Sequence, residues 1–219
     1  MTKQNNRIVF WILVFVIALC STNANAQTYD ELWKQYEEAG NKDLPRTQIG
    51  VLDKIVVKAE AAKDYGQLLS AGLRRAGLQV EISPDSLEIE VASLENRLAR
   101  YDATNPTLAA VCRALLGKIY TANGELGENH RQKGREYFDK ALANPSLLAA
   151  VQYADYKPLV AKGYDSSIFG NDLLHVIGME AGRYDLLHDY YDRTGNRAAA
   201  CLTALRLLQN KKDEMRNKD

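Results

Sequence analysis

Apolar residues recur three and four positions apart along most of this chain, and helix-capping residues interrupt the recurrence at intervals. Thr28 and Glu31 have the spacing of a capping box, while Leu44-Pro45, Ser83-Pro84 and Asn105-Pro106 put proline at the start of the segment that follows. A 3.6-residue apolar period with caps and prolines at the segment starts is typical of amphipathic helices. The sequence therefore predicts an all-α fold.

The expected helices follow one another with short connections. They cover approximately residues 28–40, 44–59, 64–80, 84–101, 106–122, 132–143, 147–151, 172–182, 184–193 and 196–209. Gly72 and Gly77 either loosen the third helix or let a neighbouring helix approach it closely. Residues 211–219 are expected to form a charged tail or the beginning of a linker. In the last helix the residues expected to face inward are Cys201, Leu202, Leu205 and Leu208.

One pair of helices resembles a tetratricopeptide unit. Leu116-Gly117-x-x-Tyr120 in its first helix and Gly134, Phe138 and Ala141 in its second match the small and large positions of that repeat. Arg113 stands where the repeat has tryptophan, and the loop is longer. Stacked hairpins bury one-sided apolar stripes. We therefore expect antiparallel, TPR-like helix hairpins over residues 27–145, in a solenoid or bundle, and a continuing helical region over residues 146–210.

An aromatic-rich connection over residues 153–167 interrupts the C-terminal helices. Its tyrosines either line a groove that contacts a partner or plug the end of the helical bundle, and the sequence is compatible with both. In the first case the candidate interaction surface consists of Tyr153, Tyr156, Lys157 and Tyr164.

The first 26 residues have the order of a secretory signal peptide. Lys3 and Arg7 precede an apolar run over residues 8–19, and Ala24-Asn25-Ala26 is an A-x-A site before Gln27. The run is shorter than the roughly 20 residues that span a bilayer as a helix. We therefore expect cleavage between Ala26 and Gln27, and a periplasmic or secreted protein without an integral membrane span.

The cysteines leave two alternatives open. Lipidation at Cys20 competes with cleavage, although the bulky Leu19 stands where a small residue normally precedes a lipidated cysteine. Cys112 and Cys201 follow the signal peptide, and are expected either as two buried thiols or as a long-range disulfide, which export would permit.

Charge and motifs argue against several function classes. The sequence has 28 basic and 28 acidic residues and no basic cluster, so nucleic acid is not an expected partner. It lacks G-x-S-x-G, G-x-x-x-x-G-K-[ST] and H-E-x-x-H motifs, and we expect no enzyme activity, no cofactor and no metal. The three histidines are expected to be structural or at the surface, including His175, which lies near Asp172 in the sequence.

Several segments together resemble the opening of bacterial alpha-2-macroglobulin-like proteins that carry a helical N-terminal region. The similarity extends from about Gln27 to the last helix, and the Tyr-Lys-Pro-Leu segment is its most specific piece. The segments that carry it are Ala26-Gln27-Thr28-Tyr29-Asp30-Glu31-Leu32-Trp33-Lys34, Asp43-Leu44-Pro45-Arg46, Asp53-Lys54-Ile55, Tyr137-Phe138-x-x-Ala141-Leu142-Ala143-Asn144-Pro145, Asp155-Tyr156-Lys157-Pro158-Leu159 and Asp172-Leu173-Leu174-His175.

The resemblance implies a periplasmic protein linked with defence against proteases, in which these helices form a non-catalytic platform for protein–protein contacts. It implies the remaining macroglobulin domains or envelope proteases as partners. The β-sandwiches, bait segment and thioester Cys-x-Glu-Gln of that family are not in this sequence, so we expect the leading module alone, as a truncated product or a stand-alone relative, without protease inhibition of its own. The alternative is an independent exported scaffold that binds a peptide or protein in a concave surface.

Overall fold

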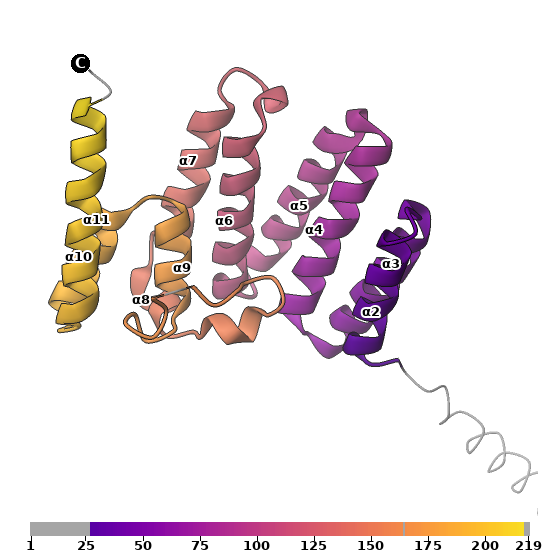
Figure 1. Cartoon of the computed structure of the whole chain (residues 1–219), viewed down its shortest axis with the longest axis horizontal. Coiled ribbons are helices and arrows are strands. Elements are labelled where there is room, and N and C mark those ends of the chain that lie inside the picture. The colour runs from indigo at the N-terminus through magenta and orange to yellow at the C-terminus, as the bar shows by residue number, and fades with distance from the viewer. Residues whose placement is uncertain (1–26, 164, 217–219) are drawn as a thin grey trace, which may run out of the picture. The chain divides into compact units, whose positions relative to one another are not determined.

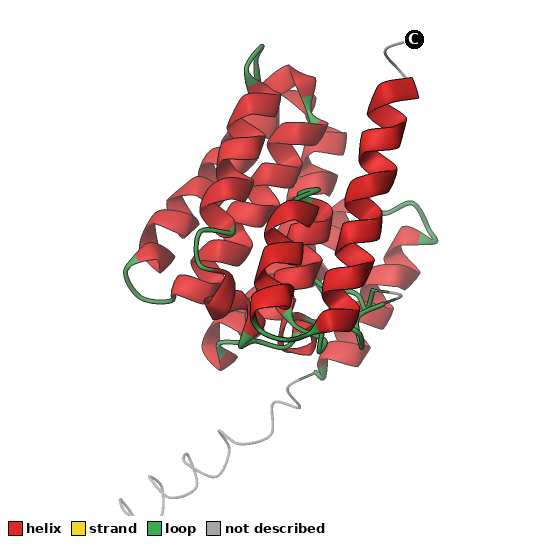
Figure 2. Ribbon diagram, turned by 90° about the vertical axis from the view of Figure 1, so that its left-hand side faces the viewer, coloured by secondary structure: helices red, strands yellow, loops and turns green. Residues whose placement is uncertain are grey.

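The structure is a computed structural model that describes residues 27–163 and 165–216. The predicted signal peptide, with Cys20 and Ala26, lies outside these residues, and so does Tyr164. Within the described ranges the chain is helical, with short 3-10 turns and no β-strand (Figures 1 and 2), so the predicted all-α fold is confirmed. None of the described helices is long and apolar enough to cross a membrane.

The described residues form α-helices and short 3-10 turns in the following order. The α-helices are α2 (Tyr29–Gly40), α3 (Pro45–Ala62), α4 (Tyr65–Ile82), α5 (Leu87–Asp102), α6 (Pro106–Ala122), α7 (His130–Ala141), α8 (Pro145–Ala149), α9 (Leu173–Glu180), α10 (Tyr184–Arg193) and α11 (Arg197–Arg216). The 3-10 turns are η1 (Pro84–Ser86), η2 (Gly124–Leu126) and η3 (Tyr153–Tyr156).

Side-chain caps start the helices at most of the predicted positions. Thr28 and Glu31 form the complete capping box of α2, and the Asn105 side chain accepts a hydrogen bond from the Leu108 amide at 3.0 Å at the start of α6. The predicted cap at Ser83 is wrong, because Ser83 makes no side-chain cap bond and the η1 turn intervenes before α5.

The described chain divides between Val51 and Leu52 into two compact parts, the first covering residues 27–51 and the second residues 52–163 and 165–216. In the described portion of the first part, α2 and the start of α3 approach each other closely at Gly40. A Cβ atom at this position would lie 2.7 Å from Nε2 of Gln48. The same amide donates a hydrogen bond to the Tyr36 carbonyl at 3.3 Å. A side chain at position 40 would therefore displace the bond that ties the two helices together.

In the second part α6 and α7 pack along their length as an antiparallel hairpin (Figure 1). Two glycines permit this approach: a Cβ atom on Gly117 would lie 2.8 Å from the Phe138 ring, and one on Gly134 would lie 2.8 Å from the Gly117 carbonyl oxygen. Phe138 and Ala141 are buried in the same interface. The small and large residues singled out in the sequence therefore meet in this hairpin.

The aromatic-rich connection belongs to the core of the second part. Its η3 turn packs closely against the first turn of α4. The approach is so close that a Cβ atom at Gly66 would overlap the backbone of Tyr156 and Lys157. Hydrogen bonds from the Tyr153 amide to the Asn171 carbonyl and from the Leu173 amide to the Val151 carbonyl, both at 2.9 Å, hold the two ends of the connection together. Tyr153 and Tyr156 are members of the buried cluster.

The structure corrects the predicted inward face of α11. Of the four residues predicted to face inward, Leu202 is partly buried against the core, but Cys201 is exposed, and Leu205 and Leu208 are 50% and 65% exposed. The buried residues of this helix are Ala199, Ala200 and Thr203. Small residues let α11 lie close to α10, so the larger side chains occupy the opposite face. The helix also continues to Arg216 rather than ending before residue 211, because the intervening Lys, Glu, Met and Arg are good helix formers.

Candidate functional site

The predicted interaction surface is largely covered. Tyr153 and Tyr156 are only 7% and 5% exposed, so their rings plug the core instead of lining an open groove. Lys157 is exposed, with its Nζ atom 5.6 Å from the centre of the Tyr153 ring. Tyr164 lies outside the described residues. Of the predicted cleavage site, only Gln27 is described, and it is exposed. Of the candidate residues that the structure describes, Lys157 alone is exposed.

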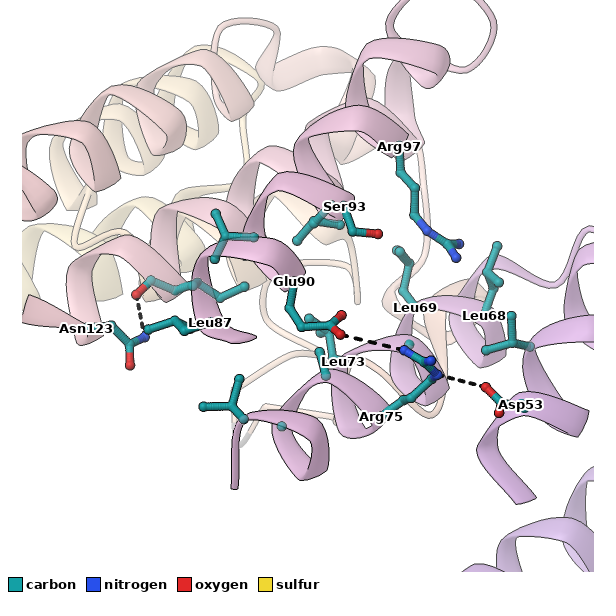
Figure 3. Close-up of a pocket in the computed structure, with 18 residues that line it drawn as sticks. Asp53, Leu68, Leu69, Leu73, Arg75, Leu87, Glu90, Ser93, Arg97 and Asn123 are labelled. Atoms are coloured by element: carbon teal, nitrogen blue, oxygen red, sulfur yellow. Dashed lines mark hydrogen bonds and ion pairs between the residues drawn. The ribbon is translucent and has the colours of Figure 1, made fainter. Parts of the chain in front are cut away.

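A groove of about 560 Å³ lies between α4 and α5 (Figure 3), in the part of the chain from Leu52 onward. These helices make little direct contact with each other beyond the η1 turn that joins them. The volume falls in the range of about 300 to 1,000 Å³ that is usual for ligand pockets. The residues that form its apolar walls are Val56, Leu68, Leu69, Leu73, Val80, Leu87, Val91, Leu94 and Ile119.

Gly72 and Gly77 also line this groove. At both positions, no heavy atom of the described chain lies within 4 Å of where a Cβ atom would be, apart from the glycine's own helix and neighbours. Each glycine destabilises a helix interior by about 1 kcal/mol relative to alanine. Close packing within the fold explains Gly66 and Gly117 but does not explain this pair. Of the two alternatives for Gly72 and Gly77, a closely approaching helix is not supplied by the described residues.

Ion pairs border the groove. Arg75 lies between Asp53 and Glu90 (Figure 3), with nitrogen–oxygen distances of 2.8 Å and 3.7 Å, and Arg97 lies 3.7 Å from Glu60. Each arginine is therefore matched by an acid. Surface pairs of this kind add little stability, but they keep the rim of the apolar groove polar and close to neutral.

A second polar cluster joins α5, α6 and α7. Glu95 accepts hydrogen bonds from the hydroxyls of Tyr120 and Tyr137 at 3.0 Å and 2.8 Å, and Lys133 lies 3.1 Å from the same carboxylate. Burial alone would raise the pKa of Glu95, but the hydrogen bonds from Tyr137, Lys133 and Tyr120 outweigh it and hold the pKa below its ordinary value. The two tyrosine rings are stacked with centroids 5.6 Å apart. The cluster therefore ties α5, which forms one wall of the groove, to α6 and α7.

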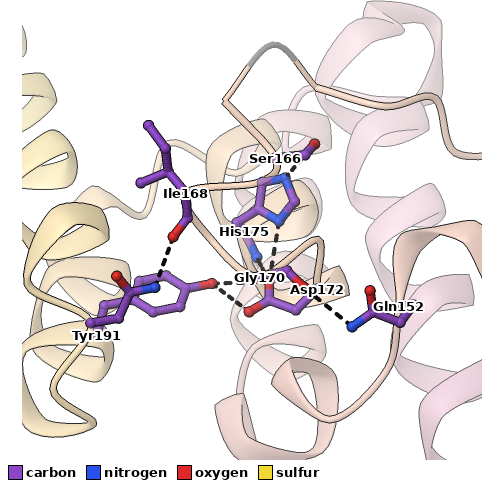
Figure 4. Close-up of polar contacts among 8 residues, drawn as sticks. Gln152, Ser166, Ile168, Gly170, Asp172, His175 and Tyr191 are labelled. Carbon is purple, nitrogen blue, oxygen red and sulfur yellow. Dashed lines mark hydrogen bonds and ion pairs between the residues drawn. The ribbon is translucent and has the colours of Figure 1, made fainter.

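A buried network lies at the base of α9 and α10 (Figure 4). Oγ of Ser166 is 3.2 Å from Nε2 of His175, whose Nδ1 is 3.2 Å from Oδ1 of Asp172. The Tyr191 hydroxyl donates to both oxygens of Asp172, at 2.9 Å and 2.8 Å. Burial and the facing Asp172 raise the pKa of Tyr191. With the Asp172 carboxylate as acceptor, Nδ1–H of His175 donates a hydrogen bond to it, and Nε2 faces the Ser166 hydroxyl.

Serine, histidine and aspartate in this order form the hydrogen-bond arrangement that activates serine nucleophiles. Ser166 is 0% exposed here, so its hydroxyl is not placed to attack a substrate. Asp172 also caps α9 through the His175 amide at 2.9 Å, and the His175 ring stacks on Phe169. We interpret the network as a structural tie between the connection, α9 and α10. In the sequence, only the closeness of Asp172 and His175 points to this network, and no pattern points to Ser166 or Tyr191.

Among the described residues no group of three or more His, Cys, Asp or Glu side chains is placed to hold a metal ion. Cys112 and Cys201 are both free thiols in the structure, so the disulfide alternative is not formed. The alternative of two buried thiols holds for Cys112 but is wrong for Cys201, which is exposed. No protein-family model, curated protein or solved structure matches this chain. The resemblance to alpha-2-macroglobulin-like proteins therefore stays a prediction.

Proposed function

We propose that this protein is a non-catalytic helical scaffold that binds an apolar segment of a partner protein in the groove between α4 and α5. The observation that carries the proposal is the pair Gly72 and Gly77, which line the groove with open space above them. Helical glycines without a packed neighbour permit another backbone to approach closely. A partner helix that lays an apolar face into a groove is a common mode of peptide recognition.

The walls and rim support this occupant. The wall residues that remain partly exposed, among them Leu73, Val80 and Leu87, would exchange contact with water for contact with the partner. This stabilises binding by about 25 cal/mol for each Å² of apolar surface buried. At the rim Arg75 and Arg97 already have acidic neighbours, so binding does not depend on a strongly charged ligand. We expect an amphipathic segment with a row of large apolar side chains.

The place of action and the partner class follow from the sequence predictions. Cleavage after Ala26 would release the scaffold into the periplasm or the medium. The resemblance to alpha-2-macroglobulin-like proteins makes macroglobulin domains or envelope proteases the partners to test first. A TPR-like stack of hairpins is the architecture that we propose for presenting the groove.

Selection from a displayed library of amphipathic peptides, followed by fluorescence anisotropy, tests the proposal. Gly72→Leu would fill the groove, whereas Gly50→Leu changes a helical glycine on α3 that also has open space above it but does not line the groove. We expect enriched peptides to lose at least about tenfold in affinity for Gly72→Leu and to bind Gly50→Leu like wild type. Failure to enrich any peptide, or equal binding to both variants, would contradict the proposal.

A further inference from the structure

Helix α11 is apolar on two opposite faces. One face is buried against the rest of the second part through Ala199, Ala200 and Thr203. The other carries Cys201, Leu205, Leu208 and Met215, which we call the outer stripe. Its Leu205, Leu208 and Met215 are 50%, 65% and 62% exposed. Large apolar side chains gathered on an exposed helix face indicate a contact surface.

The spacing of the outer stripe is that of a coiled-coil seam. Its positions 201, 205, 208 and 215 fall on alternating steps of four and three, with Lys212 at the one remaining step. The other large exposed apolar residues of the described chain are dispersed over different elements: Leu44, Val57, Ile82, Ile89 and Ile168. A 3.5-residue repeat suits a partner that is itself a helix with the same repeat.

We propose that the outer stripe packs against the outer stripe of a second copy of this chain, with the two α11 helices antiparallel. Leu205 and Leu208 are the two central leucines of the outer stripe. A two-fold axis midway between them places Leu205 of one copy beside Leu208 of the other, and Leu208 of the first copy beside Leu205 of the second. This self-complementarity is the property that a two-fold symmetric interface requires.

Charge decides between the two orientations. In a parallel pair Lys211 and Lys212 of one copy would lie beside the same lysines of the other, and like charges at flanking positions destabilise a coiled coil. In the antiparallel pair Lys212 lies opposite Cys201, and the lysines of the two copies are at opposite ends. Antiparallel helices also place the positive end of each helix dipole near the negative end of the other.

The interface is expected to be reversible. A helix of 20 residues is about 30 Å long, and one pair of such helices provides an interface at the lower end of the size range for specific contacts. We therefore expect a monomer–dimer equilibrium in the micromolar range rather than an obligate dimer.

Sedimentation velocity of the full chain over a range of concentrations tests the association. Leu208→Glu introduces a charge into the centre of the outer stripe, and Ile89→Glu makes the same change at an exposed position on α5 as a control. We expect Leu208→Glu to weaken the dimer by about a hundredfold or more and Ile89→Glu to leave it unchanged. A wild-type chain that stays monomeric at every concentration, or equal effects of the two variants, would overturn the proposal.

Cross-linking tests the orientation. In a Cys20→Ser chain, a thiol-to-amine reagent applied to a mixture of isotopically light and heavy protein should join Cys201 of one copy to Lys212 of the other. The two Cys201 thiols should not form a disulfide. Cys201 of one copy lies level with Lys212 of the other, so the two thiols are 11 helical residues, or about 16 Å, apart along the helix axis. Light–heavy dimers linked through Cys201 on both sides by a disulfide would refute the antiparallel arrangement.

Discussion

Asp172→Ala is the substitution whose effect on stability the structure defines most fully. Asp172 is buried and accepts hydrogen bonds from the His175 amide, the His175 ring and the Tyr191 hydroxyl. Loss of the helix cap costs about 1 kcal/mol, and each of the two buried donors left without an acceptor costs about 1 to 3 kcal/mol. The free energy of unfolding should therefore fall by roughly 3 to 7 kcal/mol, a large fraction of the total for a domain.

Urea denaturation followed by circular dichroism measures this loss, and two further variants isolate its parts. Asp64→Ala removes only the side-chain cap of α4 to the Gln67 amide, and should cost about 1 kcal/mol. Tyr191→Phe removes one donor, so it should be destabilising in the wild type and close to neutral in the Asp172→Ala background. If the effects of Asp172→Ala and Tyr191→Phe add, or if Asp172→Ala costs no more than Asp64→Ala, the network does not stabilise the fold as argued.

Three further predictions follow from individual residues. In a Cys20→Ser chain a thiol reagent should modify Cys201 rapidly and Cys112 only on unfolding, because burial raises the pKa of Cys112 to about 12 and shields it; equal rates for both thiols would contradict the structure. The pKa of Glu95 lies below its ordinary value of 4.5, so the stability that its carboxylate contributes is present above that pH and is lost as the pH falls. The difference in unfolding free energy between wild type and Glu95→Gln should therefore narrow from about pH 6 to about pH 3. A difference that stays constant over this range would argue against the cluster. Gly117→Ala should lower the free energy of unfolding by about 1 to 3 kcal/mol because its Cβ atom meets the Phe138 ring, while Gly72→Ala should raise it by up to about 1 kcal/mol because the position is open; the same sign for both in thermal melts would refute the packing description.

The helices were predictable because the signals that start them are local. The Thr28 capping box and the Asn105-Pro106 cap act within one helical turn, so their effect does not depend on the rest of the fold. The burial of Tyr153 and Tyr156 was one of two open alternatives, since an aromatic loop residue gives the same sequence pattern whether it plugs a core or lines a groove. The choice depends on where α4 lies, which no local pattern reports.

Two properties could not be predicted from the sequence: which face of α11 is buried, and whether the groove beside Gly72 and Gly77 is open. Two apolar stripes run along α11, and choosing the buried one requires knowing that small residues pack on α10. The glycines at positions 72 and 77 are evident in the sequence, but whether a neighbour covers them depends on how far α5 lies from α4. Both properties are tertiary, because they arise from distances between helices rather than from the pattern within one.

The claim that the groove between α4 and α5 is the binding site is tested most directly by hydrogen exchange of the full chain with and without a peptide selected on it. We predict slower exchange confined to α4 and α5, where the groove residues lie, with α10 and α11 unchanged. Protection centred on the connection around Lys157 or on α11, with none in α4 and α5, would contradict the account.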